Sequence, residues 1–555
     1  MTPQLLLQHF DRIGEAPDAI PSLCRFILDL AVRGKLVEQD PRDEPASELL
    51  KRIQAEKTRL VNSGEIKMEK PLTAIEIDEI PFAIPDKWKW VRLKDITSYI
   101  QRGKSPKYAT GDGLPVISQK CVQWGGLDLD SAKFITRESI KDYEAIRFLR
   151  SGDLLWNSTG TGTIGRIIKV TEPPLKLVCD SHVTVVRCLE VDAEYVRSWL
   201  RSDHVYGVIE DRAAGSTNQV ELTSQLAMNQ VIPLPPLAEQ HRIVAKVDEL
   251  MALCDRLEAG QTERKSRRDR LVASSLHHLN NGADANAFRE HARFYFNHLP
   301  RLTTHPDHIK QLRQTILNLA VRGKLVEQDP TDEPASELLK QIGGEKAENE
   351  PFSVPISWVW VSVDQIGDSR LGKMLDKGKN KGTPRRYLRN VNVRWFDFDL
   401  SDVFQMRFED AELDEFALRK GDVLICEGGE PGRAAVWDER ENKIYFQKAI
   451  HRIRFTEGVV PRFFVNALRQ SANSGRLSSY FTGVGIKHFT GKGLSSFVFP
   501  LPPLAEQHRI VAKVDELMAL CDQLETQLTT TQSESRHLLE AILHEALNPT
   551  LEKIA

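Results

Sequence analysis

A strongly basic segment from Arg370 to Arg394 is the part of this sequence best suited to contact a polyanion. It reads RLGKMLDKGKNKGTPRRYLRNVNVR and holds nine basic residues against one acidic residue. Lysine and arginine neutralise phosphate, whereas tyrosine can stack on a base and asparagine can hydrogen-bond to a base edge. The segment therefore predicts contact with DNA, and the alternative is a solvated basic loop. The candidate residues are Lys373, Lys377, Lys379, Lys381, Arg385, Arg386, Tyr387, Asn390 and Asn392.

A second segment, QRGKSPKYATGDGLPVISQK from Gln101 to Lys120, occupies the matching place in the first half of the chain. It holds four basic residues and one acidic residue. Here too basic side chains would bind phosphate and polar side chains would discriminate bases, against the same alternative of a solvated loop. The candidates are Gln101, Arg102, Lys104, Lys107, Tyr108, Gln119 and Lys120.

A glycine-containing loop follows a hydrophobic run in each half, after GDLLW from Gly152 and after GDVLI from Gly421. The loops read NSTGTGTIGR and EGGEPGR. The first contains a GxGxxG pattern typical of dinucleotide binding, but the second lacks the pattern and no ribose-binding acid clearly follows. Glycines that let the backbone approach DNA closely are the better interpretation. The candidate contacts are Asn157, Thr161, Arg166 and Arg433.

A third polar patch precedes each repeated proline element described below. GSTNQVELT from Gly215 aligns with GVGIKHFTGK from Gly483. Its candidate contacts are Asn218, Gln219, Lys487 and His488, although surface loops of this composition are common.

Several catalytic patterns are missing. The sequence has no G-x-x-x-x-G-K-[ST] loop, no HExxH, no GxSxG and no amino-methyltransferase motif of Asn or Asp, two prolines and an aromatic residue. Seven cysteines without a CxxC pair argue against a disulfide framework or a zinc cluster. We therefore expect a chain that catalyses no reaction and binds no cofactor or metal itself.

The elements that must position these loops are duplicated. PLPPLAEQHRIVAKVDELMALCD runs from Pro233 to Asp255 and recurs unchanged from Pro500 to Asp522. LAVRGKLVEQDP followed by DEPASELLK spans Leu30 to Lys51 and returns from Leu319 to Lys340 with one difference, Thr331 in place of Arg42. The regions between these repeats differ in sequence. This pattern indicates a duplicated scaffold, the frame, that holds two different domains, the heads.

Both repeats predict helices. In the proline element, apolar residues spaced 4, 3, 4 and 3 predict a coiled-coil seam, with Cys254 and Cys521 in a packing role. The seam residues are Ile243, Val247, Leu250 and Leu257, and in the second copy Ile510, Val514, Leu517 and Leu524. The first helix is expected to continue to about His278. In the other repeat, Gly34 and Gly323 are expected to end a helix.

The order of the repeats predicts a circular, pseudo-twofold organisation with the termini close together and two long antiparallel helices. The fold class is α+β, with two mixed, strand-rich domains separated by the helices. The expected regions are an N-terminal helical region at 1–70, a first strand-rich domain at 71–232, a central region with a long helix at 233–349, a second strand-rich domain at 350–499 and a C-terminal helix at 500–555.

Composition adds little. With 75 basic and 78 acidic residues the net charge is −3, so polyanion binding must depend on local clusters. No apolar run is long enough to cross a bilayer and the N-terminus lacks a signal peptide, so we expect a cytoplasmic protein. Two alternatives are a coiled-coil adaptor without DNA readout, and a methyltransferase or nuclease that acts alone.

The two repeats around two variable domains resemble the specificity subunit of type I restriction-modification enzymes. The resemblance covers essentially the whole chain. It implies two target recognition domains that each read one half of a bipartite site in double-stranded DNA, with helices that set the spacer. It also implies two modification (methyltransferase) subunits that use S-adenosylmethionine, and restriction subunits that use ATP and Mg2+, as partners.

Overall fold

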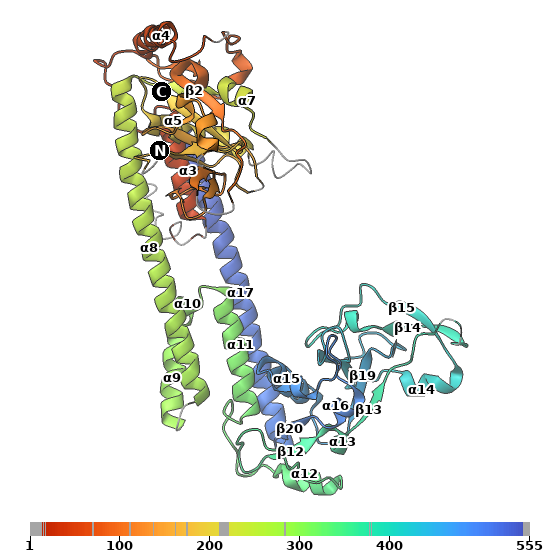
Figure 1. The fold of residues 1–555 in the computed structure, drawn as a ribbon. Helices are drawn as coiled ribbons and strands as arrows, with labels where there is room; N and C mark the ends of the chain where they lie inside the picture. Colours follow the sequence, from red (N-terminus) through yellow and green to blue (C-terminus); the bar gives the residue numbers. More distant parts are fainter. Residues whose placement is uncertain are drawn as a thin grey trace. The chain divides into compact units, whose positions relative to one another are not determined.

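The computed structural model of this chain describes residues 14, 16, 18–68, 71–109, 113–136, 138–160, 162–173, 176–209, 221–281, 285–376, 378 and 380–547 (Figure 1). The chain divides into two compact units. Unit 1 comprises Met1–Glu263 and Gln532–Ala555, and unit 2 comprises Arg264–Thr531. Each unit therefore combines one strand-rich domain with helical segments from different parts of the sequence. Among the described residues, no helix is long and apolar enough to span a membrane.

Unit 1 contains helical segments and a strand-rich domain. Its helices are α3 (Ala19–Val32), α4 (Ala46–Asn62), α5 (Ala193–Leu200), α7 (Ser224–Asn229) and the first part of α8 (Leu237–Asn281). Its strands are β1 (Lys89–Arg92), β2 (Thr97–Arg102), β3 (Leu114–Ile117), β4 (Val122–Gln123), β5 (Gly126–Leu127), β6 (Lys133–Ile135), β7 (Leu154–Asn157), β8 (Ile167–Lys169), β9 (Val178–Cys179), β10 (Val183–Cys188) and β11 (Val231–Leu234).

Unit 2 is built from the same kinds of element. Its helices are α9 (Ala285–Asn297), α10 (Leu299–Leu302), α11 (Pro306–Val321), α12 (Ala335–Gln341), α13 (Val363–Ile366), α14 (Leu413–Phe416), α15 (Pro461–Asn473), α16 (Gly491–Ser495) and the first part of α17 (Leu504–Leu547). Its strands are β12 (Val359–Ser362), β13 (Gly367–Leu371), β14 (Thr383–Leu388), β15 (Phe404–Phe408), β16 (Val423–Cys426), β17 (Ala434–Val436), β18 (Tyr445–Phe446), β19 (Ile450–Phe455) and β20 (Val498–Leu501).

The two strand-rich domains share one topology. A four-stranded sheet has the order β2-β10-β7-β8 in unit 1 and β13-β19-β16-β17 in unit 2. A three-stranded sheet has the order β6-β3-β9 and β15-β14-β18, with one antiparallel and one parallel pairing in each unit. A two-stranded ribbon, β1-β11 or β12-β20, joins the start of each domain to the strand before its long helix. The prediction of two related, mixed, strand-rich domains is confirmed.

The two long helices begin at equivalent residues. Helix α8 starts at Leu237 and α17 at Leu504, directly after Pro235–Pro236 and Pro502–Pro503, and they contain 45 and 44 residues. Proline is compatible with the first turn of a helix but not with its interior, so each pair fixes the helix start. The first helix ends three residues beyond the expected His278.

The apolar stripe of each long helix packs into the core of its own unit. Ile243, Val247 and Cys254 are buried with residues of α3 and of the first strand-rich domain, and Leu250 and Leu257 pack against the same cluster. Equivalent residues of α17 are buried with α11 and the second domain. They are Ile510, Val514 and Cys521, with Leu517 and Leu524 partly buried beside them. A seam between the two long helices themselves stays a prediction.

The end of each long helix packs on the short helix of the other repeat. In unit 1, Leu539, Ile542 and Leu543 of α17 form a small core with Ala16 and Ala19 at the start of α3. In unit 2, residues of the last turns of α8 are buried in one cluster with residues of α11. The C-terminal helix thus lies against the first described helix, as the circular organisation predicts.

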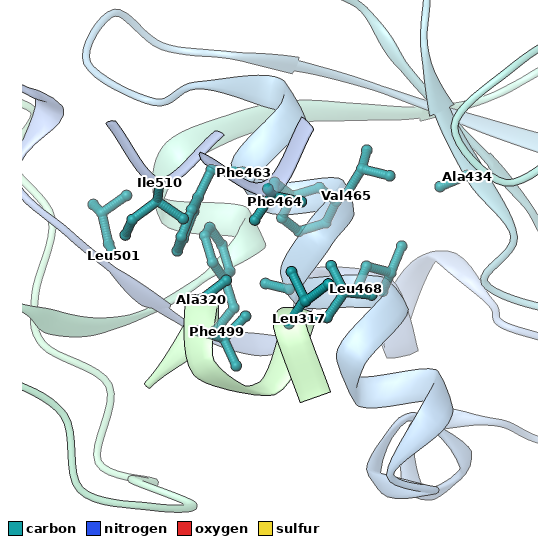
Figure 2. Packing of buried hydrophobic residues seen from close by; sticks show 14 of the residues in the cluster. Leu317, Ala320, Ala434, Phe463, Phe464, Val465, Leu468, Phe499, Leu501 and Ile510 are labelled. Atoms are coloured by element: carbon teal, nitrogen blue, oxygen red, sulfur yellow. The ribbon is translucent and has the colours of Figure 1, made fainter. Parts of the chain in front are cut away.

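The largest core of unit 2 shows how these elements join (Figure 2). Leu317 and Ala320 of α11 face Phe463, Phe464 and Leu468 of α15. The same cluster takes in residues of β20 and of the first turns of α17, namely Phe499, Leu501 and Ile510. The strand-rich domain and the repeated helices therefore share one core.

Gly34 and Gly323 end the first helix of each repeat, as predicted. Their φ values are +69° and +67°, a conformation that L side chains rarely adopt. A Cβ atom on them would lie 2.6 Å from Pro85 Cγ and 2.4 Å from Pro355 Cγ. Each turn therefore needs glycine for its backbone and for its contact with the entry to the strand-rich domain.

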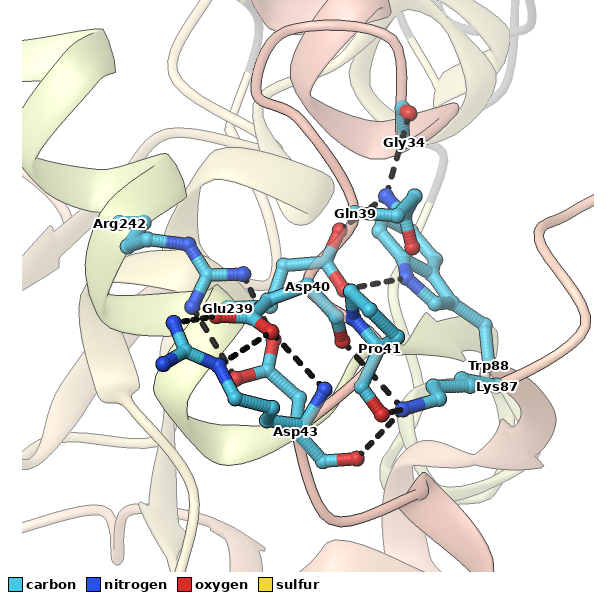
Figure 3. Close-up of polar contacts among 10 residues, drawn as sticks. Gly34, Gln39, Asp40, Pro41, Asp43, Lys87, Trp88, Glu239 and Arg242 are labelled. Carbon is cyan, nitrogen blue, oxygen red and sulfur yellow. Dashed lines mark hydrogen bonds and ion pairs between the residues drawn. The ribbon is translucent and has the colours of Figure 1, made fainter.

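A buried carboxylate joins three distant parts of each unit, and Figure 3 shows the arrangement in unit 1. In unit 1, Glu239 accepts hydrogen bonds from the indole nitrogen of Trp88, at 3.0 Å, and from the side-chain amide of Gln39. In unit 2, Glu506 accepts from Trp358, at 2.9 Å, and from Gln328. We call each arrangement the latch of its unit. It fixes the repeated helix, the repeated turn and the entry to the strand-rich domain together.

The surroundings of the latch are also duplicated. Arg242 pairs with Asp43 at 2.6 Å, and Arg509 pairs with Asp332 at 2.6 Å. Burial raises the pKa of Glu239 and of Glu506 above the ordinary value, although their hydrogen bonds act in the opposite direction. The repeated sequences therefore form one repeated polar network.

Candidate nucleic-acid interface

The glycine loops after β7 and β16 have matching backbone hydrogen bonds. Gly165 N donates to Asn157 O and Gly432 N donates to Cys426 O, both at 2.9 Å. The reverse bonds, from Asn157 N to Arg166 O and from Cys426 N to Arg433 O, measure 2.9 and 2.8 Å. Two loops of different sequence and length therefore start and end in the same geometry.

An amide side chain lies against one glycine in each loop. A Cβ atom on Gly160 would be 3.0 Å from the side-chain amide of Gln119, and one on Gly429 would be 2.8 Å from Asn390 Nδ2. Both glycines have positive φ, +105° and +83°. Gln119 and Asn390 come from the segments after β3 and β14, so the structure brings two of the predicted contact segments together in each unit.

The third predicted patch meets the same loop. Leu222 N donates to Ser158 O in unit 1, and Phe489 N donates to Glu427 O in unit 2, both at 2.8 Å. His488 lies beside Gly428, because a Cβ on that glycine would be 3.4 Å from His488 Nδ1. Asn390, Arg433 and His488 thus lie around one loop, as expected for a shared contact surface.

An ion pair with a buried aspartate holds the strand that leads into each loop. Arg187 makes two bonds of 2.7 Å to Asp153, and Arg454 makes two bonds of 2.8 Å to Asp422. The aspartates belong to the GD turns that precede β7 and β16, and both are almost fully buried. Paired bonds fix the orientation of both groups, so the strand that leads into the loop is held rigidly.

The basic loops leave their sheets through a close contact. A Cβ on Gly103 would lie 2.1 Å from Cys179 O, and one on Gly372 would lie 2.3 Å from Gln447 O. Lys104 and Lys373 follow these glycines directly. The glycines therefore let each basic loop cross the end of the neighbouring strand at the same place in both units.

Three predicted contacts in the basic segment of unit 2 are wrong, because their side chains are buried. Tyr387 belongs to a hydrophobic core, and Asn392 donates to Asp399 O and Asp402 O within its own turn, both at 2.9 Å. Lys373 is 8% exposed and pairs with Glu412. These side chains stabilise the segment and do not reach its surface.

The other basic residues of this segment are more accessible. Lys381 and Arg386 are exposed and Arg385 is half-buried, and Arg386 pairs with Glu441. Lys377 and Lys379 lie outside the described residues. Arg433 donates to Asn390 O at 2.8 Å and pairs with Glu430 at 3.0 Å. Lys487 is exposed.

One predicted contact in unit 1 is likewise wrong. Asn157 is fully buried, and its Nδ2 donates to Gln119 O at 2.9 Å and Thr163 O at 3.1 Å. It therefore holds the glycine loop onto the segment that carries Gln119. Arg166 reaches the edge of the loop instead and donates to Gln123 Oε1 at 2.8 Å.

The remaining candidates of unit 1 that the structure describes are exposed or partly exposed. Gln101, Lys104, Lys107 and Lys120 are exposed. Arg102 donates to Ser181 O at 2.7 Å and pairs with Glu221 at 3.1 Å. Tyr108 is 46% exposed, with the Lys133 ammonium 4.6 Å from its ring centre. Thr161, Asn218 and Gln219 lie outside the described residues.

The structure adds four residues that the sequence interpretation missed. Gln123 binds Arg166, and Trp124 lies half-exposed on the short turn between β4 and β5. In unit 2, Val484 and Ile486 project into solvent from a hairpin beside the glycine loop. A WGG turn and two aliphatic residues that each follow a glycine were the available signals.

Within the ranges described above, no three His, Cys, Asp or Glu side chains form a group that could hold a metal ion. The surface around each loop instead offers amides, arginine and histidine, with His182 beside Thr159 in unit 1 and His488 beside Gly428 in unit 2. These groups hydrogen-bond to base edges and phosphates.

Comparison with known proteins identifies the family. The family described as "Type I restriction modification DNA specificity domain" matches the chain twice, over residues 85–264 and 355–531. Each match contains a strand-rich domain and the first part of the long helix that follows it. These matches do not favour a coiled-coil adaptor.

Two relatives from Escherichia coli resemble nearly the whole chain. The EcoAI specificity subunit is 30% identical over 576 residues, covering 95% of this chain and 94% of the relative. The EcoEI specificity subunit is 29% identical over 590 residues, with the same coverage. A structure solved in work on complex assembly of the type I R-M system has 20% identity and a TM-score of 0.50, covering 84% of this chain and 99% of that chain, and supports a shared fold. The chain therefore belongs to the family of type I restriction enzyme specificity subunits.

Proposed function

We propose that this chain is the sequence-specific DNA-binding subunit of a type I restriction-modification complex, and that each strand-rich domain reads one half of a bipartite site. The observation that carries the proposal is the pair of glycine loops with matching backbone bonds and different surroundings. Unit 1 surrounds its loop with Gln119, Gln123 and Arg166, and unit 2 with Asn390, Glu430 and Arg433. Two loops with the same backbone geometry but different hydrogen-bond donors and acceptors are suited to recognise two different half-sites.

The charge near the loops supports contact with a duplex. Lys104, Lys107 and Lys120 flank the loop region of unit 1, and Lys381, Arg385 and Lys487 belong to the segments of unit 2. Such side chains position a protein on phosphates, whereas the amides and Arg433 can distinguish base edges. Nonspecific affinity would then depend steeply on salt concentration.

The long helices are suited to set the spacing between the half-sites. With 45 and 44 residues, α8 and α17 each extend roughly 66 Å at 1.5 Å per residue. This length limits the separation of two half-site centres to roughly 20 base pairs at 3.4 Å per step. Each helix contributes residues to both units, so the same helices would fix the register of both heads.

Two modification subunits would dock on the duplicated scaffold. Buried groups such as the latch account for part of the identity between the two proline elements. Exposed residues are identical as well: Ala238, His241 and Ala245 lie on the surface of α8, and Ala505, His508 and Ala512 lie on the surface of α17. Because internal packing does not require these side chains, a common partner with two equivalent sites explains their identity best.

Catalysis would belong to the partners. In this proposal the modification subunits use S-adenosylmethionine and methylate DNA, while restriction subunits use ATP and Mg2+ to move and cut it. This chain would bind none of these cofactors, in agreement with the missing catalytic motifs. Its contribution would be the choice of DNA sequence.

A binding experiment with the full chain and its co-expressed modification subunit tests the proposal. Sites methylated in the host genome supply the duplex probe, and a probe whose spacer is lengthened by five base pairs is the control. Tight, salt-sensitive binding to the native probe alone is expected. Equal binding of both probes at all salt concentrations would contradict a bipartite reader.

A further inference from the structure

A short hairpin in unit 2 presents two aliphatic side chains to solvent. Thr482 and His488 pair through two reciprocal backbone bonds of 2.9 Å, which close a five-residue loop between them. Gly483 has a φ of +98°, and a Cβ atom there would lie 2.1 Å from Ile486 O. Val484 is 103% exposed and Ile486 74% exposed. The hairpin is thus tightly turned, and its tip is apolar.

The base of the hairpin is fixed to the candidate interface. Phe489 is buried, and its backbone N–H donates to Glu427 O in the glycine loop at 2.8 Å. The ring of buried His451 bonds to Phe489 O through Nε2, also at 2.8 Å. The base of the hairpin is therefore held beside Gly428, and the tip extends from this fixed base.

The chemistry around the tip is mixed. Lys487 and His488 follow Ile486 directly and are exposed, and Asn390 and Arg433 belong to the same loop cluster. Exposed aliphatic groups on such a tip mark a contact site. Only one groove of DNA combines an apolar group with hydrogen-bond acceptors on the base edges, since the major groove carries the 5-methyl group of thymine.

We propose that Val484 and Ile486 enter the major groove and read thymine through its 5-methyl group. This inference rests on the proposed DNA-binding function and names a base feature that the second domain recognises. The neighbouring Lys487 and His488 would contact phosphates or acceptor atoms while the two aliphatic side chains exclude water from the methyl group.

The first domain has a different sequence at the aligned positions, which lie outside the described residues. Thr223 and Thr490 both accept a backbone hydrogen bond as the N-cap of a helix, which fixes the alignment at an offset of 267 residues. Sequence alone then pairs Val484, Gly485 and Ile486 with Thr217, Asn218 and Gln219. These three aligned residues include no aliphatic side chain comparable to Ile486, so a methyl contact is expected in one half-site and not in the other.

Uracil substitution tests the proposal directly, because uracil lacks the methyl group and keeps the base pair. The full chain in complex with its modification subunit is titrated with duplexes in which each thymine of the recognition site is replaced in turn. The half-site of unit 2 is the one that changes when residues 350–499 are exchanged. Wild type is expected to lose about fourfold in affinity at one or more thymines of that half-site, the value of one buried methyl group.

The double variant Val484→Ser and Ile486→Ser is expected to bind more weakly and to bind thymine and uracil duplexes equally. Ile356→Ser is the matched control, since Ile356 is 105% exposed and precedes the ribbon strand β12. It should keep the wild-type uracil pattern. An unchanged thermal unfolding midpoint of the double variant excludes misfolding as the cause. The Ile486→Val variant, which keeps an aliphatic side chain, should still distinguish thymine from uracil.

The possible results separate the two proposals. The methyl contact is wrong if uracil is tolerated everywhere in this half-site, if the half-site contains no thymine, or if the serine variant retains discrimination. Normal DNA discrimination with loss of the modification subunit would instead mark the tip as a protein contact. Failure of wild type to bind any split site would overturn the proposed function itself.

Discussion

Trp88 donates a hydrogen bond from its indole nitrogen to Glu239, which lies 151 residues further along the chain, at 3.0 Å. Both side chains are almost fully buried. The bond joins the entry of the strand-rich domain to the first turn of the long helix. Trp358 and Glu506 repeat it in unit 2, so in each unit one carboxylate links the strand-rich domain to its long helix in addition to their shared core.

Replacement of both latch carboxylates, Glu239→Gln with Glu506→Gln, should flatten the dependence of stability on pH. Burial raises the folded-state pKa of each carboxyl above its ordinary value of 4.5. The folded state therefore binds the proton more tightly, so this contribution to stability is fully present below pH 4.5 and is lost as pH rises through the folded pKa. Urea unfolding of both proteins between pH 4 and pH 8 measures the difference.

The wild-type free energy of unfolding should decline relative to that of the variant as pH rises. If the free energy of unfolding changes with pH in the same way in both proteins, folding does not raise the pKa of these carboxyls. Glu239→Ala, which leaves the buried Trp88 N–H without an acceptor, should cost about 1–3 kcal/mol.

Gly34→Ala should destabilise unit 1 more than Gly64→Ala. Both glycines have positive φ, +69° and +76°, so alanine meets a similar backbone cost of about 1 kcal/mol in each. At Gly34 the new Cβ would also lie 2.6 Å from Pro85 Cγ, whereas nothing lies within 4 Å of it at Gly64. Equal shifts of the unfolding midpoint for the two variants would contradict this account of the turn.

Asp153→Asn should cost about 3–5 kcal/mol, because it leaves the buried Arg187 guanidinium without its charged partner. Asp422→Asn should cost less, because the side chain of Arg454 is 30% exposed and water can solvate its charge. Hydrogen exchange resolved by unit should show the loss in unit 1 for the first variant and in unit 2 for the second. Lys246→Ala, which removes an exposed pair with Glu249 at 2.9 Å, is the control and should change stability by less than about 0.5 kcal/mol.

Ala245→Arg should remove one of two modification subunits from the complex, since the new side chain would project from the proposed docking face of α8. Ala512→Arg should do the same on α17, and the double variant should bind neither subunit. Mass measurement of the assembled complex reads the stoichiometry. Ala259 is exposed but lies outside the repeat, so Ala259→Arg should retain both subunits. Retention of both by all variants would place the docking surface elsewhere.

The sequence predicts the helical scaffold well, because the sequence elements that form the scaffold occur twice. Two identical proline elements and two AVRGKLV repeats indicate the long helices, their starts and the turns at Gly34 and Gly323. The latch could not be predicted, because no periodicity links Glu239 to Trp88 across 151 residues. Once the structure brings them together, the repeats explain why the network occurs in both units.

The interface was harder to predict, since residue type does not determine burial. Tyr387, Asn392, Lys373 and Asn157 have groups that bind nucleic acids, but each lies inside its domain and stabilises a turn, a core or a loop. Conversely, Ile486 was not among the predicted contacts, and its aliphatic side chain is exposed. The fold is therefore needed to distinguish polar residues that stabilise a domain from polar residues that are exposed and could contact DNA.

Exchange of one head tests the central claim most directly. Residues 71–232 are replaced by the corresponding domain of another specificity subunit, and the methylated sites of a host that expresses the complex are sequenced. Two heads that read independently predict a changed sequence in one half-site, with the other half-site and the spacer length retained. A change in both half-sites, or in neither, would contradict the account.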